Sequence, residues 1–186
     1  MDAQPDPAVF DDLLAANRAF AESHPLSGFD GVARAGVAMV TCMDSRIDPL
    51  GMIGLRPGDA KILRNPGGRV TDQALIALVL GVNLLGVDRI LVVQHTRCAM
   101  ASTSETELRR QLSEASGRDA SWLSLDVIPD QVSCIRDDLA KVRAHPLIGT
   151  SVAIGGFLYD VETGLLGRVS ETRGDDPAVT RSQRSG

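Results

Sequence analysis

The sequence predicts an α/β fold, with a mostly parallel central sheet flanked by helices and an antiparallel hairpin at one edge. Apolar runs at 36–41 and 89–94 indicate strands buried on both faces, because they lack the polar alternation of a half-exposed strand. Helical patterns with capping residues lie between such runs, which is typical of a parallel sheet. Two further strands, at 151–159 and 165–169, enclose a turn at 162–164 and indicate the hairpin.

In the first part of the chain, capping residues and apolar runs set the order of the elements. Asp6 is suited to cap a helix, and Pro7 fits its first turn, where no amide hydrogen bond is needed. This helix is expected to end near 24–25. The elements expected after it are a strand at 36–41, a short helical turn at 48–54, a strand at 60–63 and a turn at 64–68.

In the second part, two of the expected helices begin at capping residues, and the third is expected from its amphipathic pattern. Thr71 precedes a helix to about Leu85 that is apolar nearly all round, so we expect it to be buried on several sides, as at a dimer interface. Ser104 and Glu107 have the spacing of a capping box. The elements expected here are helices at 71–85, 104–115 and 130–144, the strand at 89–94, and the hairpin at 151–169.

The length and composition suit one domain with a substantial core. The chain has 186 residues, of which 44% are hydrophobic. We expect an N-terminal helix and arm over 1–35 and an α/β domain over 36–170. The residues from 171 to 186 are mostly polar, so we expect a disordered tail there.

Charge and hydropathy argue against two classes of partner. The net charge is −5 and no basic stripe is evident, so no nucleic-acid partner is expected. The strongest apolar stretch, 74–82, is too short to span a bilayer, so no membrane partner is expected. The first six residues lack the basic start and apolar core of a secretory signal, and we therefore expect a cytoplasmic protein. In a reducing compartment, the three cysteines are expected to serve metal binding or catalysis rather than disulfides.

Two polar segments stand at the ends of predicted buried strands. Cys42 follows the first apolar run, and His95 and Cys98 follow the run at 89–94. Ligands bind beyond the carboxyl ends of parallel strands, so these three side chains meet if the two strands are neighbours. Two thiolates and one imidazole suit Zn²⁺ and leave one coordination position open, as in a catalytic zinc site.

Three motifs in order resemble the β-class carbonic anhydrases, the zinc enzymes that hydrate carbon dioxide. They are Cys42-Met43-Asp44-Ser45-Arg46, Arg64-Asn65-Pro66-Gly67 and His95-Thr96-Arg97-Cys98, and the similarity runs from about Gly36 to Tyr159. The resemblance implies an α/β fold, a homodimer or higher homo-oligomer, and active sites near the subunit interface.

Within this resemblance, Asp44 and Arg46 are the expected catalytic residues. Asp44 either orients the reacting hydroxide or binds zinc as a fourth ligand, and the family uses both states. The planar fork of Arg46 is suited to pair with Asp44 and hold it off the metal. Both alternatives for Asp44 remain open from the sequence.

The turn at 64–68 is expected to lie beside the site. Asn65, Gly67 and Gly68 either contact the substrate or only shape the turn, and Arg64 is expected to form a structural ion pair. The sequence departs from the family pattern at three positions, which are Pro66, Arg97 and Ala99. Pro66 restricts Asn65 to an extended backbone, and Ala99 is unfavourable if its position requires a positive φ.

The predicted function is the reversible hydration of carbon dioxide to bicarbonate and a proton. One alternative is hydrolysis of carbon disulfide or carbonyl sulfide at the same zinc. A second is a catalytically silent module that binds zinc or bicarbonate and regulates a partner. A third is a structural zinc domain.

Overall fold

A computed structural model describes residues 7–170 of the chain, which fall into two compact units. The first unit ends at Asp30 and contains the 3₁₀ helix η1 (Pro7–Phe10) and helix α1 (Asp11–Ala21). The second unit starts at Gly31 and contains every strand found between residues 7 and 170. The expected cap at Asp6 and the expected tail at 171–186 lie outside the described residues.

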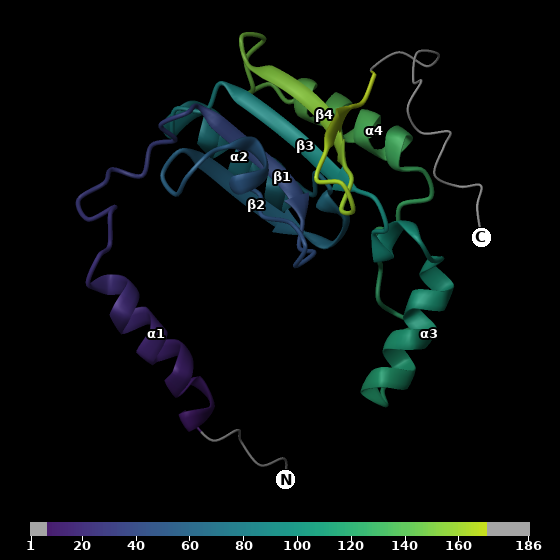
Figure 1. The fold of residues 1–186 in the computed structure, drawn as a ribbon. Helices are drawn as coiled ribbons and strands as arrows, with labels where there is room; N and C mark the ends of the chain where they lie inside the picture. Colours follow the sequence, from purple (N-terminus) through teal and green to yellow (C-terminus); the bar gives the residue numbers. More distant parts are fainter. Residues whose placement is uncertain (1–6, 171–186) are drawn as a thin grey trace. The chain divides into compact units, whose positions relative to one another are not determined.

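The second unit is built on one five-stranded sheet with the order β2-β1-β3-β4-β5 (Figure 1). The first four strands are parallel, and β5 pairs antiparallel with β4. The strands are β1 (Val37–Cys42), β2 (Ala60–Asn65), β3 (Arg89–His95), β4 (Ala153–Tyr159) and β5 (Leu166–Arg168). The predicted α/β class and the edge hairpin are therefore confirmed.

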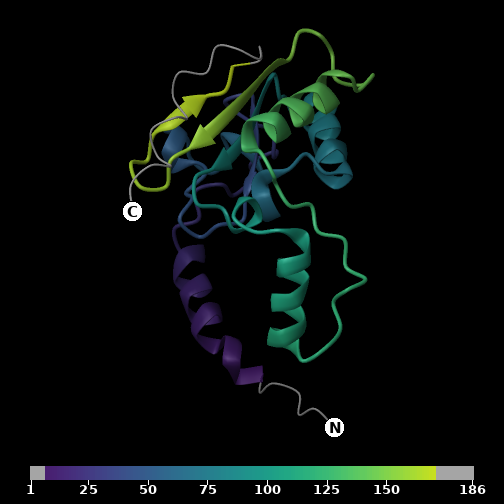
Figure 2. The ribbon, with the colours of Figure 1, turned by 90° about the vertical axis from the view of Figure 1, so that its right-hand side faces the viewer.

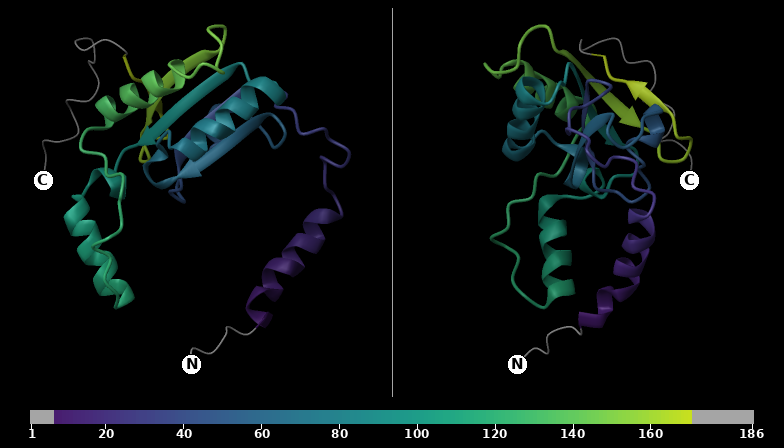
Figure 3. Two further views of the ribbon diagram at one scale, coloured as in Figure 1. Left: turned by 180° about the vertical axis from the view of Figure 1, so that it is seen from behind. Right: turned by 90° about the vertical axis from the view of Figure 1, so that its left-hand side faces the viewer.

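Helices α2 (Asp72–Leu84) and α4 (Gln131–Arg143) lie on the same face of the sheet (Figure 3). The connections from β2 to β3 and from β3 to β4 both step in one direction across the sheet, and right-handed crossovers that step in one direction share a face. The connection from β1 to β2 steps the opposite way and carries only the short η2 (Gly51–Ile53). Helix α3 (Glu105–Ser116) buries no residue and projects away from the sheet (Figure 2).

The predicted caps are present at the starts of α2 and α3, and the structure adds a third cap at the start of α4. The Thr71 hydroxyl accepts a hydrogen bond from the Ala74 amide at 3.2 Å, and the Ser104 hydroxyl accepts one from the Glu107 amide at 3.2 Å. Asp130, at the start of α4, accepts from the Ser133 amide at 2.7 Å. Side-chain oxygens at these positions satisfy amides that have no partner within the helix, and this fixes where each helix begins.

The main core lies between the sheet and helices α2 and α4. All six residues of β1 are buried, as expected for a central strand with continuous apolar character. The buried members of this core include Ala38, Val40, Leu78, Ile90, Val92, Ile135, Leu139 and Val142.

Within the single chain α2 is buried on one side only, and its burial on several sides, as at a dimer interface, stays a prediction. Only Ala74, Leu78 and Gly81 of α2 are buried. Ile76, Leu80 and Leu84 are between 47% and 70% exposed within the second unit, because one helix face is enough to cover the sheet.

The sheet order places the carboxyl ends of β1 and β3 next to each other. From β1 the chain first crosses to β2 on one side and later to β3 on the other, so the ends of β1 and β3 mark the point where the strand order reverses. The condition on which the metal prediction depended, that these strands are neighbours, is met. No helix between residues 7 and 170 has the length and apolar character that a membrane crossing requires.

Candidate metal centre

The three predicted donor residues meet at the carboxyl edge of the sheet. Cys42 is the last residue of β1, His95 is the last residue of β3, and Cys98 follows after a tight loop. Their donor atoms all lie within 4.8 Å of one another, and all three residues are buried. The two Sγ atoms are 4.0 Å apart, close to the separation of about 3.8 Å that a tetrahedral ion with Zn–S bonds of about 2.3 Å imposes.

His95 is oriented so that one ring nitrogen faces the two sulfurs. Its Nδ1 lies 2.9 Å from the Thr96 carbonyl oxygen, an arrangement in which Nδ1 carries the proton and Nε2 keeps a free lone pair. Nε2 is fully buried and has no hydrogen-bond partner. The His95 carbonyl is in turn held by Gln131 Nε2 of α4 at 2.8 Å. A buried, unpartnered imidazole nitrogen is costly unless a ligand occupies the position that it faces, so this geometry fits a metal ion.

The electrostatics of the site favour thiolate at Cys42. The contact with the Cys98 thiol, together with His95 and the Gly67 amide at 3.3 Å, lowers the pKa of Cys42, although burial opposes the shift. The same Cys42–Cys98 contact and burial raise the pKa of Cys98. The site therefore favours loss of a proton from one of the two sulfurs, and thiolate is the form that binds metal.

Asp44 lies beside the donor set and is held by Arg46 through both carboxylate oxygens. Arg46 Nε donates to Oδ1 at 2.9 Å and Nη2 donates to Oδ2 at 2.7 Å, and the Arg46 amide also donates to Oδ1 at 2.9 Å. These contacts hold the pKa of Asp44 well below its usual range. Asp44 Oδ2 is 3.9 Å from His95 Nε2, so the carboxylate is adjacent to the donors while its oxygens are bonded to Arg46.

Arg64 donates hydrogen bonds to the backbone of the Cys42–Arg46 motif. The sequence did not indicate these contacts. Its Nε donates to the Cys42 carbonyl at 3.0 Å and its Nη2 donates to the Asp44 carbonyl at 2.6 Å. The expectation of an ion pair is wrong for this residue, because its guanidinium is directed at two carbonyl oxygens of the neighbouring chain segment. Its position on β2, paired with Thr41 in the sheet, was the one signal that could have suggested this contact.

The turn over η3 (Pro66–Gly68) packs directly on the strand ends. Asn65 has an extended backbone, as predicted from Pro66, and both atoms of its side-chain amide bond to the Arg69 backbone, at 2.7 and 2.8 Å. Gly68 has a φ of +66°, and a Cβ there would lie 2.6 Å from the Val93 carbonyl oxygen. The turn thus needs glycine for close approach, and the contribution of Asn65, Gly67 and Gly68 to substrate binding stays a prediction.

The loop between His95 and Cys98 contains a backbone feature that the sequence did not indicate. Arg97 has a φ of +57° and is the only non-glycine residue with positive φ within residues 7–170. Ala99 lies in η4 (Ala99–Ala101) and is not in that region, so alanine carries no backbone penalty there. The positive φ therefore occurs at Arg97, two residues before Ala99, where the resemblance to the family had suggested it.

Apolar side chains surround the sulfur atoms. Ile47 is buried together with Cys42 and Cys98, and the partly buried residues packed against this group are Met52, Met100, Ala101 and Tyr159. The site therefore combines polar donors with an apolar wall, the usual composition of a small-molecule site.

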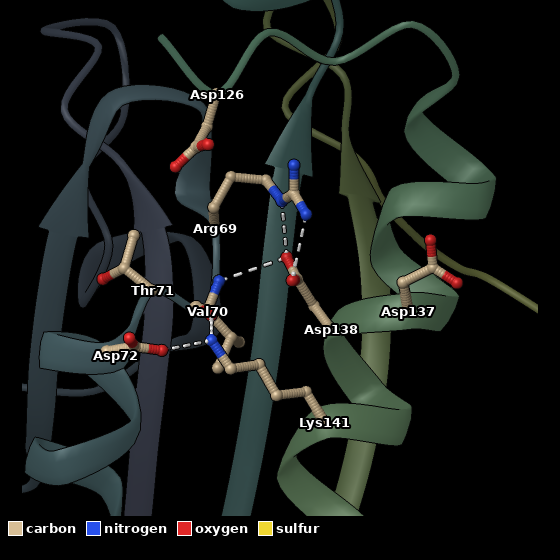
Figure 4. Close-up of a pocket in the computed structure, with 8 residues that line it drawn as sticks. All are labelled: Arg69, Val70, Thr71, Asp72, Asp126, Asp137, Asp138 and Lys141. Carbon is tan, nitrogen blue, oxygen red and sulfur yellow. Dashed lines mark hydrogen bonds and ion pairs between the residues drawn. The ribbon is translucent and has the colours of Figure 1, made fainter. Parts of the chain in front are cut away.

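A second polar cluster lies in a cavity of ≈ 460 Å³ between α4 and the turn that leads into α2 (Figure 4). Asp138 accepts from Arg69 Nε at 2.8 Å, from Arg69 Nη2 at 3.2 Å and from the Val70 amide at 3.1 Å. Lys141 donates to the Val70 carbonyl at 3.0 Å and to Asp72 at 2.8 Å. These bonds tie α4 to the segment after η3, so the cluster fixes the turn that touches Cys42.

Comparisons with known proteins agree with this geometry. The family model described as "Carbonic anhydrase" matches residues 37–125, which include all three motifs. "Beta-carbonic anhydrase 1" of Mycobacterium tuberculosis is 33% identical over 166 residues, which cover 87% of this chain and 98% of that protein.

Two further relatives extend the comparison. A carbonic anhydrase from Streptococcus mutans of known structure superimposes with a TM-score of 0.78 at 35% identity, covering 90% of this chain and all of that one. A "Carbon disulfide hydrolase" of Acidithiobacillus thiooxidans is 32% identical over 147 residues, which cover 67% of this chain and 72% of that protein. Fold, donor geometry and these similarities lead to one conclusion: the chain belongs to the β-class carbonic anhydrase family.

Proposed function

We propose that the protein is a zinc enzyme that catalyses the reversible hydration of carbon dioxide to bicarbonate and a proton. The observation that carries the proposal is the buried Cys42–His95–Cys98 donor set, with an unpartnered His95 Nε2 and the Asp44–Arg46 pair beside it. Family membership supports it independently.

Zinc is the metal that we propose for the three donors. Two thiolates and one imidazole, with one position left for substrate, suit zinc in a catalytic role. Zinc bound there supplies Lewis acidity, which makes water acidic enough to react as a nucleophile near neutral pH. The thiols must remain reduced to serve, and all three cysteines are free, so we propose a reducing compartment such as the cytoplasm.

Asp44 is proposed to orient the attacking water. Its carboxylate is ionised because Arg46 lowers its pKa, so it accepts a hydrogen bond and aims the remaining lone pair of the nucleophile at the substrate carbon. Arg46 donates hydrogen bonds to both carboxylate oxygens. These bonds disfavour coordination of the metal by Asp44 as a fourth ligand.

The substrate side of the site suits a small molecule without charge. Carbon dioxide has no net dipole, and the apolar groups of Ile47, Met52, Met100 and Tyr159 favour it over water. We propose that the turn of Asn65, Gly67 and Gly68 shapes this side, with its polar groups already bonded to the protein.

We also propose that the protein self-associates. Ile76, Leu80 and Leu84 form an exposed apolar stripe on α2, at the i, i+4, i+8 spacing that lies along one helix face. Leu13, Leu14 and Phe20 give α1 further apolar surface that one helix does not bury by itself. Sedimentation velocity is expected to show a dimer or larger species, and Leu80→Glu is expected to shift it toward monomer, whereas Leu165→Glu on the hairpin does not.

The function is tested by measuring metal content and carbon dioxide hydration on the same sample. We expect about one zinc per chain and hydration that disappears when zinc is removed. Cys98→Ser is expected to lose zinc and activity together, whereas Cys134→Ser, which changes the buried cysteine on α4 outside the site, retains both. Stoichiometric zinc without hydration from neutral to alkaline pH would contradict the proposed reaction and favour a silent zinc or bicarbonate-binding module.

Carbon disulfide hydrolysis is the second candidate, because a relative of 32% identity carries that name. The same samples are assayed with carbon disulfide and carbonyl sulfide. Turnover of these substrates that exceeds hydration of carbon dioxide would favour this candidate over the first.

A further inference from the structure

The backbone of Arg97 is held in a conformation that residues other than glycine, asparagine and aspartate rarely adopt. Its φ of +57° places it in the left-handed region, which crowds the Cβ of an ordinary residue. Packing of its side chain gives no reason for this, because that side chain is 66% exposed. A strained residue of this kind persists only where its surroundings over-determine it.

Both neighbours of Arg97 are fixed by several hydrogen bonds. The Thr96 amide donates to the Tyr159 carbonyl at 2.9 Å, and the Thr96 hydroxyl accepts from the Val161 amide at 3.1 Å, which ties the loop to the β4–β5 hairpin. On the other side, the Cys98 carbonyl accepts from the Ser102 hydroxyl at 2.7 Å and from the Ala101 amide at 3.0 Å. Arg97 must span these two fixed points, and the left-handed conformation is the one that does so.

The result of this conformation is a carbonyl oxygen directed at the catalytic pair. The Arg97 oxygen accepts a hydrogen bond from Arg46 Nη2 at 3.1 Å. The same Nη2 donates to Asp44 Oδ2 at 2.7 Å. Arg46 has a long side chain that is 43% exposed, so a third acceptor restricts its rotamers and holds its fork toward Asp44.

We propose that Arg97 is a positioning residue whose left-handed backbone presents its carbonyl to Arg46 and so fixes the guanidinium that holds Asp44 off the metal donors. This deepens the proposed function, since it rests on the Asp44 role given there. The Glu162 carboxylate contacts the Arg97 guanidinium, but both side chains are more than 60% exposed, so this ion pair adds little to the conformation. The backbone conformation of residue 97, and not its side-chain charge, is what orients Arg46.

A substitution series separates the backbone from the side chain. Arg97→Gly and Arg97→Asn remove the guanidinium but adopt positive φ readily, whereas Arg97→Ala resists it and Arg97→Val, which is β-branched, resists it most. Glu162→Gln removes only the ion pair. The variants are loaded with cobalt(II) in place of zinc, and azide is titrated while the visible absorption of the cobalt is recorded.

We expect azide to bind the Gly and Asn variants and Glu162→Gln within threefold of the unsubstituted protein. The Val variant is expected to bind azide at least tenfold more weakly, because Arg46 loses an acceptor and Asp44 is released to occupy the position that azide needs. Carbon dioxide hydration is expected to fall in the same order, with Asn rescuing the loss seen with Val.

Equal azide affinity in the Gly and Val variants would overturn the proposal. If both bind azide as tightly as the unsubstituted protein, the backbone conformation has no effect. If both lose affinity equally, the side chain is the important part. If the Val variant does not fold or hold cobalt, the Ala and Asn variants decide: Ala is expected to bind azide at least threefold more weakly than Asn, and equality contradicts the proposal. Absence of hydration in the unsubstituted protein would refute the proposed function alone, because the cobalt spectrum reports the site without turnover.

Discussion

Two arginine–aspartate pairs in this protein have nearly the same hydrogen-bond geometry and opposite surroundings. Arg46 grips Asp44 through Nε and Nη2 at 2.9 and 2.7 Å, and Arg69 grips Asp138 through the same atoms at 2.8 and 3.2 Å. The Asp138 side chain is 4% exposed, whereas the Asp44 side chain is 21% exposed and lies 3.9 Å from His95 Nε2. Burial thus makes one pair a structural tie, whereas the other pair lies beside the metal donors and is partly exposed, as its proposed role requires.

Breaking the buried pair is expected to give the largest loss of stability. Asp138→Ala leaves Arg69 without its carboxylate and the Val70 amide without an acceptor, which is expected to lower the free energy of unfolding by about 3–5 kcal/mol. Urea denaturation measures this. The matched control is Asp137→Ala, one residue earlier and exposed on α4, for which a change of about 0.5 kcal/mol is expected. Equal losses in the two variants would contradict a structural role for Asp138.

Breaking the pair at the metal donors is expected to change rate rather than stability. Asp44→Asn keeps the shape but removes the charge that Arg46 grips, so kcat/KM for hydration is expected to fall about 10²-fold or more. The free energy of unfolding is expected to fall by less than in Asp138→Ala, because Asp44 is more exposed and asparagine still accepts the hydrogen bond from the Arg46 amide. Asp48→Asn, four residues further on, is the control and is expected to retain activity. A stability loss in Asp44→Asn as large as that of Asp138→Ala would remove the distinction between the pairs.

Replacing Arg46 or Arg69 by lysine is expected to give smaller effects that still differ between the two pairs. Lysine keeps the charge but not the two-pronged fork. Arg46→Lys is expected to lower kcat/KM about tenfold with little change in stability. Arg69→Lys is expected to lower the free energy of unfolding by about 1–2 kcal/mol with unchanged activity per zinc, since only hydrogen bonds to a charged group are lost. Both variants are compared by denaturation and by hydration rate.

A third pair, between Arg110 and Glu107, lies wholly on the surface, and its disruption is expected to have the smallest effect. Arg110 donates to Glu107 through Nε at 2.8 Å and Nη2 at 2.6 Å, and with Gln111 it lowers the pKa of Glu107 to about 2. A lowered folded-state pKa means that this contact stabilises α3 above the ordinary glutamate pKa of about 4.3 and that the stabilisation is lost as the pH falls toward 2. Carboxyl NMR titration is expected to give a midpoint near 2, which rises toward the ordinary value in Arg110→Gln. An unchanged midpoint would show that the pair does not form in solution.

The same comparison shows what the sequence could reveal. Asp44 and Arg46 are two positions apart, so their pairing and their position after a buried strand were predictable. Asp138 and Arg69 are 69 positions apart and come together only when α4 packs on the sheet, and an aspartate within an amphipathic helix gives no sign of being buried. Local motifs and strand ends therefore predicted the metal donors. Contacts that depend on packing, such as the one between Arg69 and Asp138, could not be predicted from the sequence.

Two further features explain why the rest of the site required the structure. Arg64 was expected to form an ion pair, but the register of β2 against β1 directs it to the carbonyls of Cys42 and Asp44. The left-handed backbone of Arg97 follows from hydrogen bonds to the hairpin, and arginine is a residue type that gives no warning of positive φ. Likewise, the continuous apolar pattern of α2 does not say which face the single chain covers.

The central claim is that Cys42, His95 and Cys98 hold one zinc ion, and X-ray absorption at the zinc edge of the purified protein tests it most directly. We expect one zinc per chain with two sulfur neighbours at about 2.3 Å and two lighter neighbours at about 2.0–2.1 Å. A folded protein that takes up no zinc, or a zinc spectrum without two sulfur neighbours, would contradict the account.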